Sequence, residues 1–267
     1  MFLHFKSAGK LPNRSEMASL AEIVRYADEE LRLAEIEDYA NALNGLQIEN
    51  SGAVTKIGAT VDASRHTIEM AIERAIDLLI VHHGLFWPGL RPLTGPLFCT
   101  VKTALAGNLA LYSAHLPLDF HPALGNNARL AAALGLEKTK PFLQLKGQLS
   151  GLLAEAALGR DELLGRLEHS LGGPVRCIAA GPLRTQRIGI VTGGAGSEIY
   201  EVAREGIDTY ITGEAPHWAA VAAEELGVNL FLGGHYATET FGVKALAGQL
   251  AERFGLSWEF LDHPTGL

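Results

Sequence analysis

The sequence predicts an α/β protein of two related lobes, each with a mostly parallel sheet flanked by helices. Three observations support this fold class. Short apolar runs alternate with segments of helical periodicity, the second half of the chain repeats part of the first, and polar side chains follow the ends of three apolar runs. Because ligands collect beyond the carboxyl ends of parallel strands, the third observation places a site in the cleft between the lobes.

The composition is that of a well-packed globular protein. The chain has 267 residues, 48% of them hydrophobic, and a mean hydropathy of +0.13, which suits one large or two modest α/β domains. Its apolar runs are far shorter than the roughly 18–20 residues that a membrane span requires. Residues 1–16 lack the apolar core of a secretory signal, and we interpret them as a disordered extension ahead of Met17.

The charge and the cysteines argue against several classes of function. The net charge is −8 and the isoelectric point about 5.7. Lysine and arginine are scattered, so we expect no nucleic-acid binding through phosphate neutralisation and no membrane-surface helix. Cys99 and Cys177 lie far apart without a CxxC spacing, which indicates reduced thiols in a cytoplasmic protein.

Helices and strands alternate along the chain. The first helix is expected at residues 18–33, where Leu20, Ile23, Val24 and Ala27 recur at helical spacing. Further helices are predicted at residues 66–75, 101–106, 128–134 and 161–171. Short apolar runs, rich in β-branched and other large residues, predict strands at residues 57–61, 76–81, 109–113, 147–157 and 175–180. This rhythm is typical of a sheet with helices on its faces.

Part of the first half recurs later in the chain. At an offset of 131 residues, the matching runs are Lys56-Ile57-Gly58 with Arg187-Ile188-Gly189, and Ile76-Asp77 with Ile207-Asp208. At an offset of 120, His115 meets His235 and Asp119 meets Glu239. We interpret this as two related lobes. Residues 17–125 and 225–267 are predicted to form lobe one, and residues 126–224 lobe two.

A pair of adjacent histidines follows the apolar run at residues 76–81. His82 and His83 stand where a parallel strand would end, and packing gives no reason for two imidazoles there. Neutral imidazole is the commonest side-chain ligand for transition metals. Taken alone, a solvated histidine pair in a loop is an equally good interpretation.

Two further runs end in similar groups. The run at residues 109–114 leads into His115 and Asp119, and the run at residues 229–234 leads into His235 and Glu239. If a helix starts near His235, its spacing of four residues to Glu239 puts both on one face. Three strand ends that each supply histidine or carboxylate favour a metal site.

The five candidate ligands exceed the needs of one ion. They are His82, His83, Asp119, His235 and Glu239. A catalytic zinc ion usually takes three protein ligands, so the set suits two divalent ions about 3.5–4 Å apart. Nitrogen and oxygen donors without thiolate favour Zn, Fe, Mn, Co or Ni. Such a pair supplies a hydroxide nucleophile at neutral pH, which predicts a hydrolytic reaction.

Other polar residues are candidates for proton transfer. His115 and His121 flank Asp119 and could support the ligands or shuttle protons. Glu214 and His217 could serve as general acid or base, although a surface loop is nearly as good an interpretation of these two. The glycine-rich segment at residues 192–197 is similar to a phosphate-binding loop. It lacks the lysine and spacing of one, so we favour a tight turn.

Taken together, the motifs resemble the type 2 homologues of GTP cyclohydrolase I, a family of Nif3-like hexameric proteins with dinuclear metal centres. The matching motifs are NGLQIE at 44–49, VHHGLFW at 81–87, SAHLPLD at 113–119, TGE at 212–214 and GGHYATE at 233–239. The resemblance runs from about Met17 to the carboxyl terminus. It implies that His82, His83, Asp119, His235 and Glu239 occupy the family's metal-ligand positions.

The resemblance also implies an assembly and an activity. The family forms a toroidal hexamer whose metal sites face an inner cavity, so we expect a homohexamer. The family name implies opening of the GTP imidazole ring with release of C8 as formate, with His115 or Glu214 protonating the departing nitrogen. The alternatives are a dinuclear hydrolase acting on another bond, such as a phosphoester or amide, and a non-catalytic hexameric scaffold or metal-binding regulator.

Overall fold

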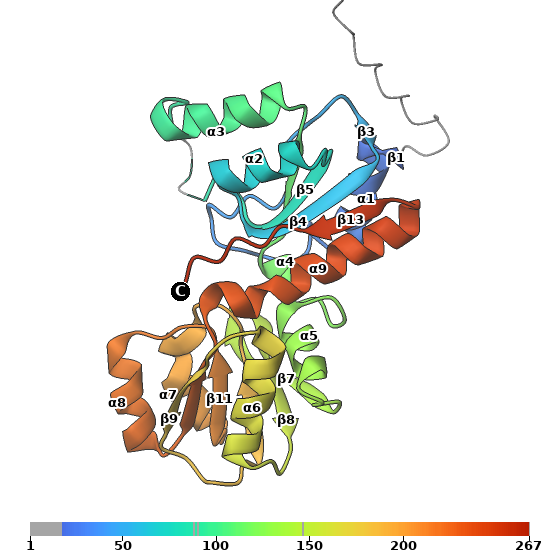
Figure 1. Cartoon of the computed structure of the whole chain (residues 1–267). Helices are drawn as coiled ribbons and strands as arrows, with labels where there is room; N and C mark the ends of the chain where they lie inside the picture. Colours follow the sequence, from blue (N-terminus) through green and yellow to red (C-terminus); the bar gives the residue numbers. More distant parts are fainter. Residues whose placement is uncertain (1–17, 88, 90, 146, 267) are drawn as a thin grey trace, which may run out of the picture.

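The chain folds into two lobes that lie one above the other in Figure 1. The structure is a computed structural model that describes residues 18–87, 89, 91–145 and 147–266. The predicted extension at residues 1–16 lies outside the described residues. Among the helices of the described ranges, none is long and apolar enough to cross a membrane.

The first lobe is built on a five-stranded sheet in the order β13-β4-β5-β6-β2. Its strands are β2 (Gly45–Ile48), β4 (Lys56–Asp62), β5 (Leu78–His83), β6 (Ala110–Ser113) and β13 (Ser257–Phe260). Strands β13, β4, β5 and β6 run parallel, and β2 pairs antiparallel with β6. A separate antiparallel ribbon pairs β1 (Ala18–Ser19) with β3 (Ala53–Val54).

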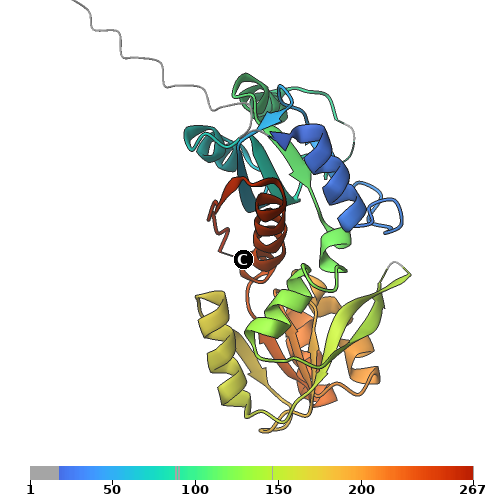
Figure 2. The ribbon, with the colours of Figure 1, turned by 90° about the vertical axis from the view of Figure 1, so that its right-hand side faces the viewer.

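Helices cover both faces of this sheet (Figures 1 and 2). Helices α1 (Leu20–Glu30) and α9 (His235–Phe254) pack on one face, and α2 (Arg65–Glu73) and α3 (Gly95–Ala106) on the other. Helix α1 buries Leu20, Ile23 and Ala27, three of the residues whose spacing predicted it. Helix α2 begins with a capping box between Ser64 and Thr67. The core of this lobe is therefore closed on two sides.

The second lobe has a six-stranded sheet in the order β7-β8-β10-β11-β12-β9. Its strands are β7 (Thr139–Leu145), β8 (Gln148–Glu155), β9 (Arg176–Ala179), β10 (Arg187–Ile190), β11 (Thr209–Thr212) and β12 (Asn229–Leu232). Helices α5 (Asn126–Ala133) and α6 (Arg160–Leu171) cover one face, and α7 (Ile199–Arg204) and α8 (His217–Leu226) the other. The 3-10 helix η2 (Ala195–Glu198) leads into α7.

This second sheet corrects the expectation of mostly parallel sheets. Strands β10, β11 and β12 are parallel, but β7, β8 and β9 join antiparallel. The fold class is otherwise confirmed, with two α/β lobes. Apolar patterning reports which residues are buried and leaves the direction of the partner strand open, so the sequence could not reveal the mixed topology.

The repeat predicted from the sequence is present in the structure. Strands β4, β5 and β6 correspond to β10, β11 and β12, with α2 and α7 as their first crossover helices. Ile76 and Ile207 pack over Gly58 and Gly189, where a Cβ would lie 2.6 and 2.8 Å from their Cδ1 atoms. In both lobes the glycine thus permits close packing of the isoleucine that precedes the next strand.

The boundary predicted at residue 225 is wrong. Strand β12 (Asn229–Leu232) pairs with β11 and β9, so it belongs to lobe two. The chain returns to lobe one through α9, which starts at the junction of the lobes and packs along β4. The outward crossing lies between α4 (Leu116–Asp119) and α5. The internal repeat accounts for this placement, because β12 pairs with β11 in lobe two as β6 pairs with β5 in lobe one.

Candidate metal centre

The carboxyl end of β5 supplies the two adjacent histidines. Strand β5 is central in the first sheet, and it includes His82 and His83 rather than ending before them. His82 is completely buried, and the His83 side chain is 22% exposed. The interpretation of the pair as a solvated loop is therefore wrong.

The next parallel strand, β6, leads into the short helix α4. His115 stands at the start of α4 and Asp119 at its end. The third contribution comes from α9, which carries His235 at its first position and Glu239 one turn later. Gly234, which precedes α9, has φ +89°, a conformation that glycine adopts without strain. The tight turn lets the helix start directly at the lobe junction.

The structure brings all five predicted ligands together. Glu239 is at the centre, with its Oε1 3.6 Å from His82 Nε2 and its Oε2 3.4 Å from His83 Nε2 and 3.1 Å from His235 Nε2. Asp119 Oδ2 lies 3.4 Å from His82 Nε2. The His82 Nε2 and Glu239 Oε2 atoms are buried without a hydrogen bond among the described residues. Buried polar atoms without partners are costly, and a cation between them would remove the cost.

The Nδ1 atoms of His82, His83 and His235 each contact an oxygen atom of the protein. His82 Nδ1 lies 2.8 Å from the Ala114 carbonyl oxygen, and His83 Nδ1 lies 2.8 Å from Asp62 Oδ1. His235 Nδ1 lies 2.9 Å from Glu214 Oε1. This pattern is typical of metal-binding histidines, because the partner fixes the ring and leaves Nε2 free to bind.

The clustered carboxylates and imidazoles shift the pKa values of His82, His235 and Glu239. Burial by itself lowers the pKa of His82, but the charges of Asp119 and Glu239 outweigh it and raise the pKa well above its usual value. The adjacent carboxylate of Glu239 raises the pKa of His235 to about 9, against the opposing effect of burial. Burial raises the pKa of Glu239, but His82 and His235 hold it below its usual range. The carboxylates thus favour positive charge on these imidazoles, as they would favour a bound cation.

His115 extends the cluster. The donor atoms of His82, His83 and His115 lie within 4.8 Å of one another, as do those of His83, His235 and Glu239. His115 Nδ1 lies 3.0 Å from Asp38 Oδ1. The His115 side chain therefore presents its other nitrogen to the cluster, where it can bind a cation or exchange a proton.

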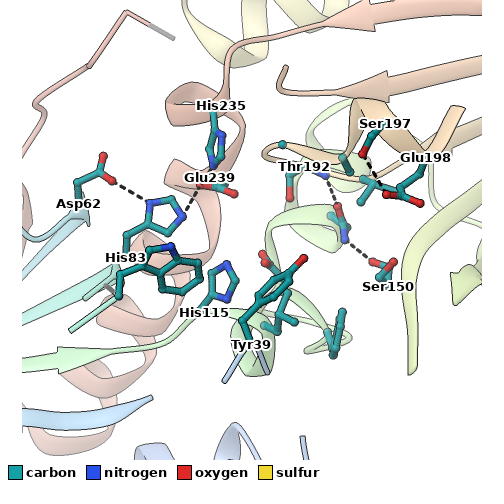
Figure 3. Close-up of a pocket in the computed structure, with 18 of the residues that line it drawn as sticks. Tyr39, Asp62, His83, His115, Ser150, Thr192, Ser197, Glu198, His235 and Glu239 are labelled. Atoms are coloured by element: carbon teal, nitrogen blue, oxygen red, sulfur yellow. Dashed lines mark hydrogen bonds and ion pairs between the residues drawn. The ribbon is translucent and has the colours of Figure 1, made fainter. Parts of the chain in front are cut away.

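A cavity of about 570 Å³ opens beside the cluster, between the two lobes. Figure 3 shows the histidines and Glu239 on one side of it and Ser150, Thr192, Ser197 and Glu198 on the other. The first side comes from lobe one and the start of α9, and the second from lobe two. The site therefore lies in the cleft between the lobes, as the strand ends predicted.

Sequence reasoning missed two acidic residues that position histidines. Asp62 ends β4, the strand beside β5, so the same strand-end argument would have found it. Asp38 lies in the loop between α1 and β2 and also accepts a hydrogen bond from Asn44 Nδ2 at 2.8 Å. Nothing near Asp38 in the sequence signals this role, because only the fold brings it to His115.

The other polar residues predicted to take part in proton transfer differ in their distance from the cluster. Glu214 contacts His235, as described, and its side chain is 49% exposed. His121 Nδ1 accepts hydrogen bonds from the backbone of residues 123 and 124, and its Nε2 lies 3.5 Å from Glu30, away from the cluster. His217 begins α8 and is exposed. Neither His121 nor His217 is among the residues lining the cavity within the described ranges.

The glycine-rich segment at residues 192–197 forms a turn whose backbone is hydrogen-bonded to side chains of other segments. The Thr192 amide donates to Asn127 Oδ1 at 2.8 Å, and the Gly193 amide donates to Thr238 Oγ1 at 3.1 Å. Because these two amides are occupied within the protein, they are not available to a phosphate. The structure thus agrees with a tight turn here.

Comparisons with known proteins agree with this geometry. The family described as Duf34/NIF3 (NGG1p interacting factor 3) matches residues 18–265. The chain belongs to the DUF34/NIF3 family. A DUF34/NIF3 relative from Deinococcus radiodurans, named GTP cyclohydrolase 1 type 2 homolog, is 41% identical over 248 residues, which cover 92% of this chain and 94% of the relative. One of the same name from Pyrococcus horikoshii is 40% identical over 249 residues, covering 92% and 98%. These matches confirm the resemblance drawn from the motifs.

Solved structures share the DUF34/NIF3 fold. The protein TTHA1606 from Thermus thermophilus aligns with a TM-score of 0.87 and 39% identity, covering 94% of this chain and all of that one (100%). The protein ybgI, of unknown function, aligns with a TM-score of 0.85 and 37% identity over the same shares of 94% and 100%. Reduced HcgD from Methanocaldococcus jannaschii aligns at 0.82 and 26% identity, covering 92% and 99%. The two-lobe architecture is therefore shared across nearly the whole chain.

Proposed function

We propose that this DUF34/NIF3 protein is a hydrolase that depends on two divalent metal ions held between its lobes. The observation that carries the proposal is the convergence of three Nε2 atoms on the Glu239 carboxylate, with each imidazole fixed through Nδ1. Three strand ends far apart in the sequence supply these groups. A purely structural cluster would be expected to satisfy its buried atoms, yet His82 Nε2 and Glu239 Oε2 have no hydrogen bond within the described residues.

The residues present fit two ions that share Glu239. His82 and Asp119 would hold one ion, and His83 and His235 the other, with one oxygen of Glu239 for each. Imidazole and carboxylate donors suit Zn, Fe, Mn, Co or Ni. Divalent ions in such a site act as Lewis acids and supply a hydroxide nucleophile near neutral pH.

The chain's own residues would manage the protons. His115 lines the cavity and Asp38 accepts the hydrogen bond from its Nδ1, so the remaining nitrogen can deliver a proton to a leaving group. Glu214 holds His235 through Nδ1 and orients its Nε2 toward Glu239. Glu214 is thus a positioning residue in this proposal rather than the acid that the sequence suggested.

The most concrete reaction is the opening of the imidazole ring of GTP with release of formate. The name shared by the relatives, GTP cyclohydrolase 1 type 2 homolog, supports this choice. A cavity of about 570 Å³ lies within the usual range of small-molecule sites. Hydrolysis of a phosphoester or amide bond is the second candidate, and a non-catalytic hexameric scaffold is the third.

Formate release from GTP tests the proposal. Protein reconstituted separately with Zn, Fe, Mn, Co and Ni is incubated with GTP and formate is measured. We expect turnover with at least one metal and a loss of at least about 100-fold in His83→Ala, because the loss of one ligand disorders the site. His169→Ala, on the exposed face of α6, is the matched control. Absence of formate with all five metals rejects the cyclohydrolase, and a panel of phosphoesters and amides then separates the second candidate from the scaffold.

The assembly is a separate part of the proposal. We infer that six copies form a ring with their metal centres facing a shared inner space. Light scattering on the purified protein would give a mass near six times 28.5 kDa. A monomeric or dimeric mass at micromolar concentration would contradict the ring without affecting the metal site, because all five ligands come from one chain.

A further inference from the structure

The cavity has a second wall that the metal chemistry does not use. Ser197 and Glu198 belong to η2 in lobe two, and Figure 3 shows Glu198 across the cavity from the histidines. Glu198 Oε1 accepts a hydrogen bond from Ser197 Oγ at 3.0 Å, and it forms no other hydrogen bond with the described residues. A carboxylate in a cavity wall can accept two parallel hydrogen bonds from a ligand.

Two exposed aromatic side chains line the cavity between these walls. Trp87 is 39% exposed and Tyr39 is 43% exposed, and their ring centroids lie 6.1 Å apart. The Trp87 ring is 4.7 Å from the His115 ring and 5.9 Å from the His83 ring, so it borders the metal cluster. Aromatic rings left exposed in a cavity are well suited to stack against a flat ligand.

Tyr39 connects this aromatic surface with the far wall. Its ring lies 6.0 Å from the His115 ring. Tyr39 and Glu198 both line the cavity. Burial raises the pKa of the Tyr39 hydroxyl, and the charges of Asp38 and Glu198 raise it further, which is consistent with this placement. The Trp87 and Tyr39 rings are inclined by 64°, so a flat molecule stacked on Trp87 would meet Tyr39 at its edge, with the metal cluster on one side and Glu198 across the cavity.

We propose that this half of the cavity binds a planar nitrogen heterocycle that presents a ring N–H and an adjacent amino group to Glu198. Trp87 provides the stacking surface, Tyr39 adds an edge contact, and the two carboxylate oxygens accept the paired donors. A guanine-type edge has this donor pair, whereas an adenine-type edge places an acceptor nitrogen against the carboxylate and is repelled. The inference rests on the proposed function, because it assigns the substrate-recognition residues of that same site.

Nucleoside binding to the Zn²⁺-loaded protein tests the recognition, measured by calorimetry without any turnover. We expect guanosine to bind most tightly, then inosine, which lacks the amino group, and then adenosine, with about tenfold between guanosine and adenosine. All three carry the same imidazole nitrogen, so contact with the metal does not produce this order. Equal affinities for the three nucleosides would overturn the proposal.

Variants separate the two parts of the subsite. Glu198→Gln should abolish the preference for guanosine, whereas Trp87→Leu should weaken all three nucleosides by about tenfold and keep their order. Matched controls are Glu201→Gln, which is exposed on α7, and Trp218→Leu, which is 45% exposed on α8. A Glu198→Gln protein that still prefers guanosine would refute the role of this carboxylate.

The outcome is distinguishable from a failure of the proposed function. If guanosine is preferred but no nucleotide releases formate, the result supports the recognition subsite and contradicts the cyclohydrolase activity. If formate is released from GTP but guanosine and adenosine bind alike, the activity stands and Glu198 is not the recognition residue.

Discussion

His235 Nε2 lies 3.1 Å from Glu239 Oε2, one turn away on the helix that returns the chain from lobe two to lobe one. The two residues sit where the lobes meet, and the carboxylate of Glu239 also contacts His82 and His83 from β5. One side chain thus ties the first turn of α9 to the central strand of the first sheet.

Glu239→Gln should remove the bridge between the two proposed ions. An amide binds divalent ions far more weakly than a carboxylate, so we expect the metal content to fall from about two equivalents per chain to less than about one. Elemental analysis of protein dialysed against a fixed concentration of free Zn²⁺ measures this. Glu252→Gln, exposed further along α9, should retain the full content. Two equivalents in Glu239→Gln would contradict a shared carboxylate.

Asp62→Asn should weaken metal binding without removing a ligand. The Asp62 carboxylate lies 2.8 Å from His83 Nδ1, which fixes the ring with its Nε2 toward Glu239. Loss of such a partner typically lowers metal affinity by about 10- to 100-fold. Competition with a chromogenic chelator gives the affinity, and Glu69→Gln, exposed on α2, serves as the control. An unchanged affinity would show that His83 needs no support from Asp62.

Gly193→Ala should disrupt the centre by filling its space. Gly193 has φ +71°, and a Cβ built there would lie 2.1 Å from Glu239 Oε1. Gly227 has a similar φ of +66°, but a Cβ would meet nothing within 4 Å. Both substitutions should therefore cost about 1 kcal/mol of unfolding free energy for the left-handed backbone. Only Gly193→Ala should also lose metal binding, and urea denaturation with metal analysis checks both effects.

Metal binding should strengthen as the pH rises. The pKa of His235 is raised to about 9 in the metal-free protein, so this imidazole carries a proton at pH 7 that a metal must displace. Affinity should therefore fall as the pH drops below about 9. Calorimetry in buffers of different ionisation enthalpy should detect proton release on binding at pH 7. Binding that is independent of pH between about 6 and 9 would contradict the raised pKa.

The stability of the metal-free protein should show the opposite trend. A histidine whose pKa is higher in the folded than in the unfolded protein stabilises the fold. This stabilisation is complete at pH values below the unfolded-state pKa of about 6.5. For His235 this stabilisation is lost as the pH rises from about 6.5 through about 9. Chemical denaturation of chelator-treated protein should show a falling unfolding free energy across this range. His235→Ala should flatten that part of the curve.

The fold could be predicted in its main lines because burial leaves a local pattern. The spacing of Leu20, Ile23 and Ala27 predicted α1, and the apolar run before His82 predicted β5 to within two residues. The antiparallel strands β2 and β7 were missed. Their sequences, with Gln47 in one and Pro141 in the other, carry no apolar run, and they depend on their partner strands.

The candidate ligands could be found from sequence because each lies at or just beyond the carboxyl end of an apolar strand. The rule that ligands collect beyond such strand ends, together with the internal repeat, was enough to select His82, His83, Asp119, His235 and Glu239. The repeat also shows how the lobes diverged. His82 corresponds to Gly213 in lobe two, where a Cβ would lie 2.7 Å from the Gly193 carbonyl oxygen and 2.8 Å from His235 Cα. The start of α9 occupies the space that a second histidine would need.

The α/β class, the repeat and the five metal-binding candidates could all be inferred from the sequence, since they depend on local patterns of burial and polarity. Which acids hold the histidines, and what faces them across the cavity, became known from the folded chain. Asp38 reaches His115 from a loop 77 residues earlier in the chain, and Glu198 faces the centre from the other lobe. Contacts of this kind depend on the packing of whole lobes, and no local pattern encodes them.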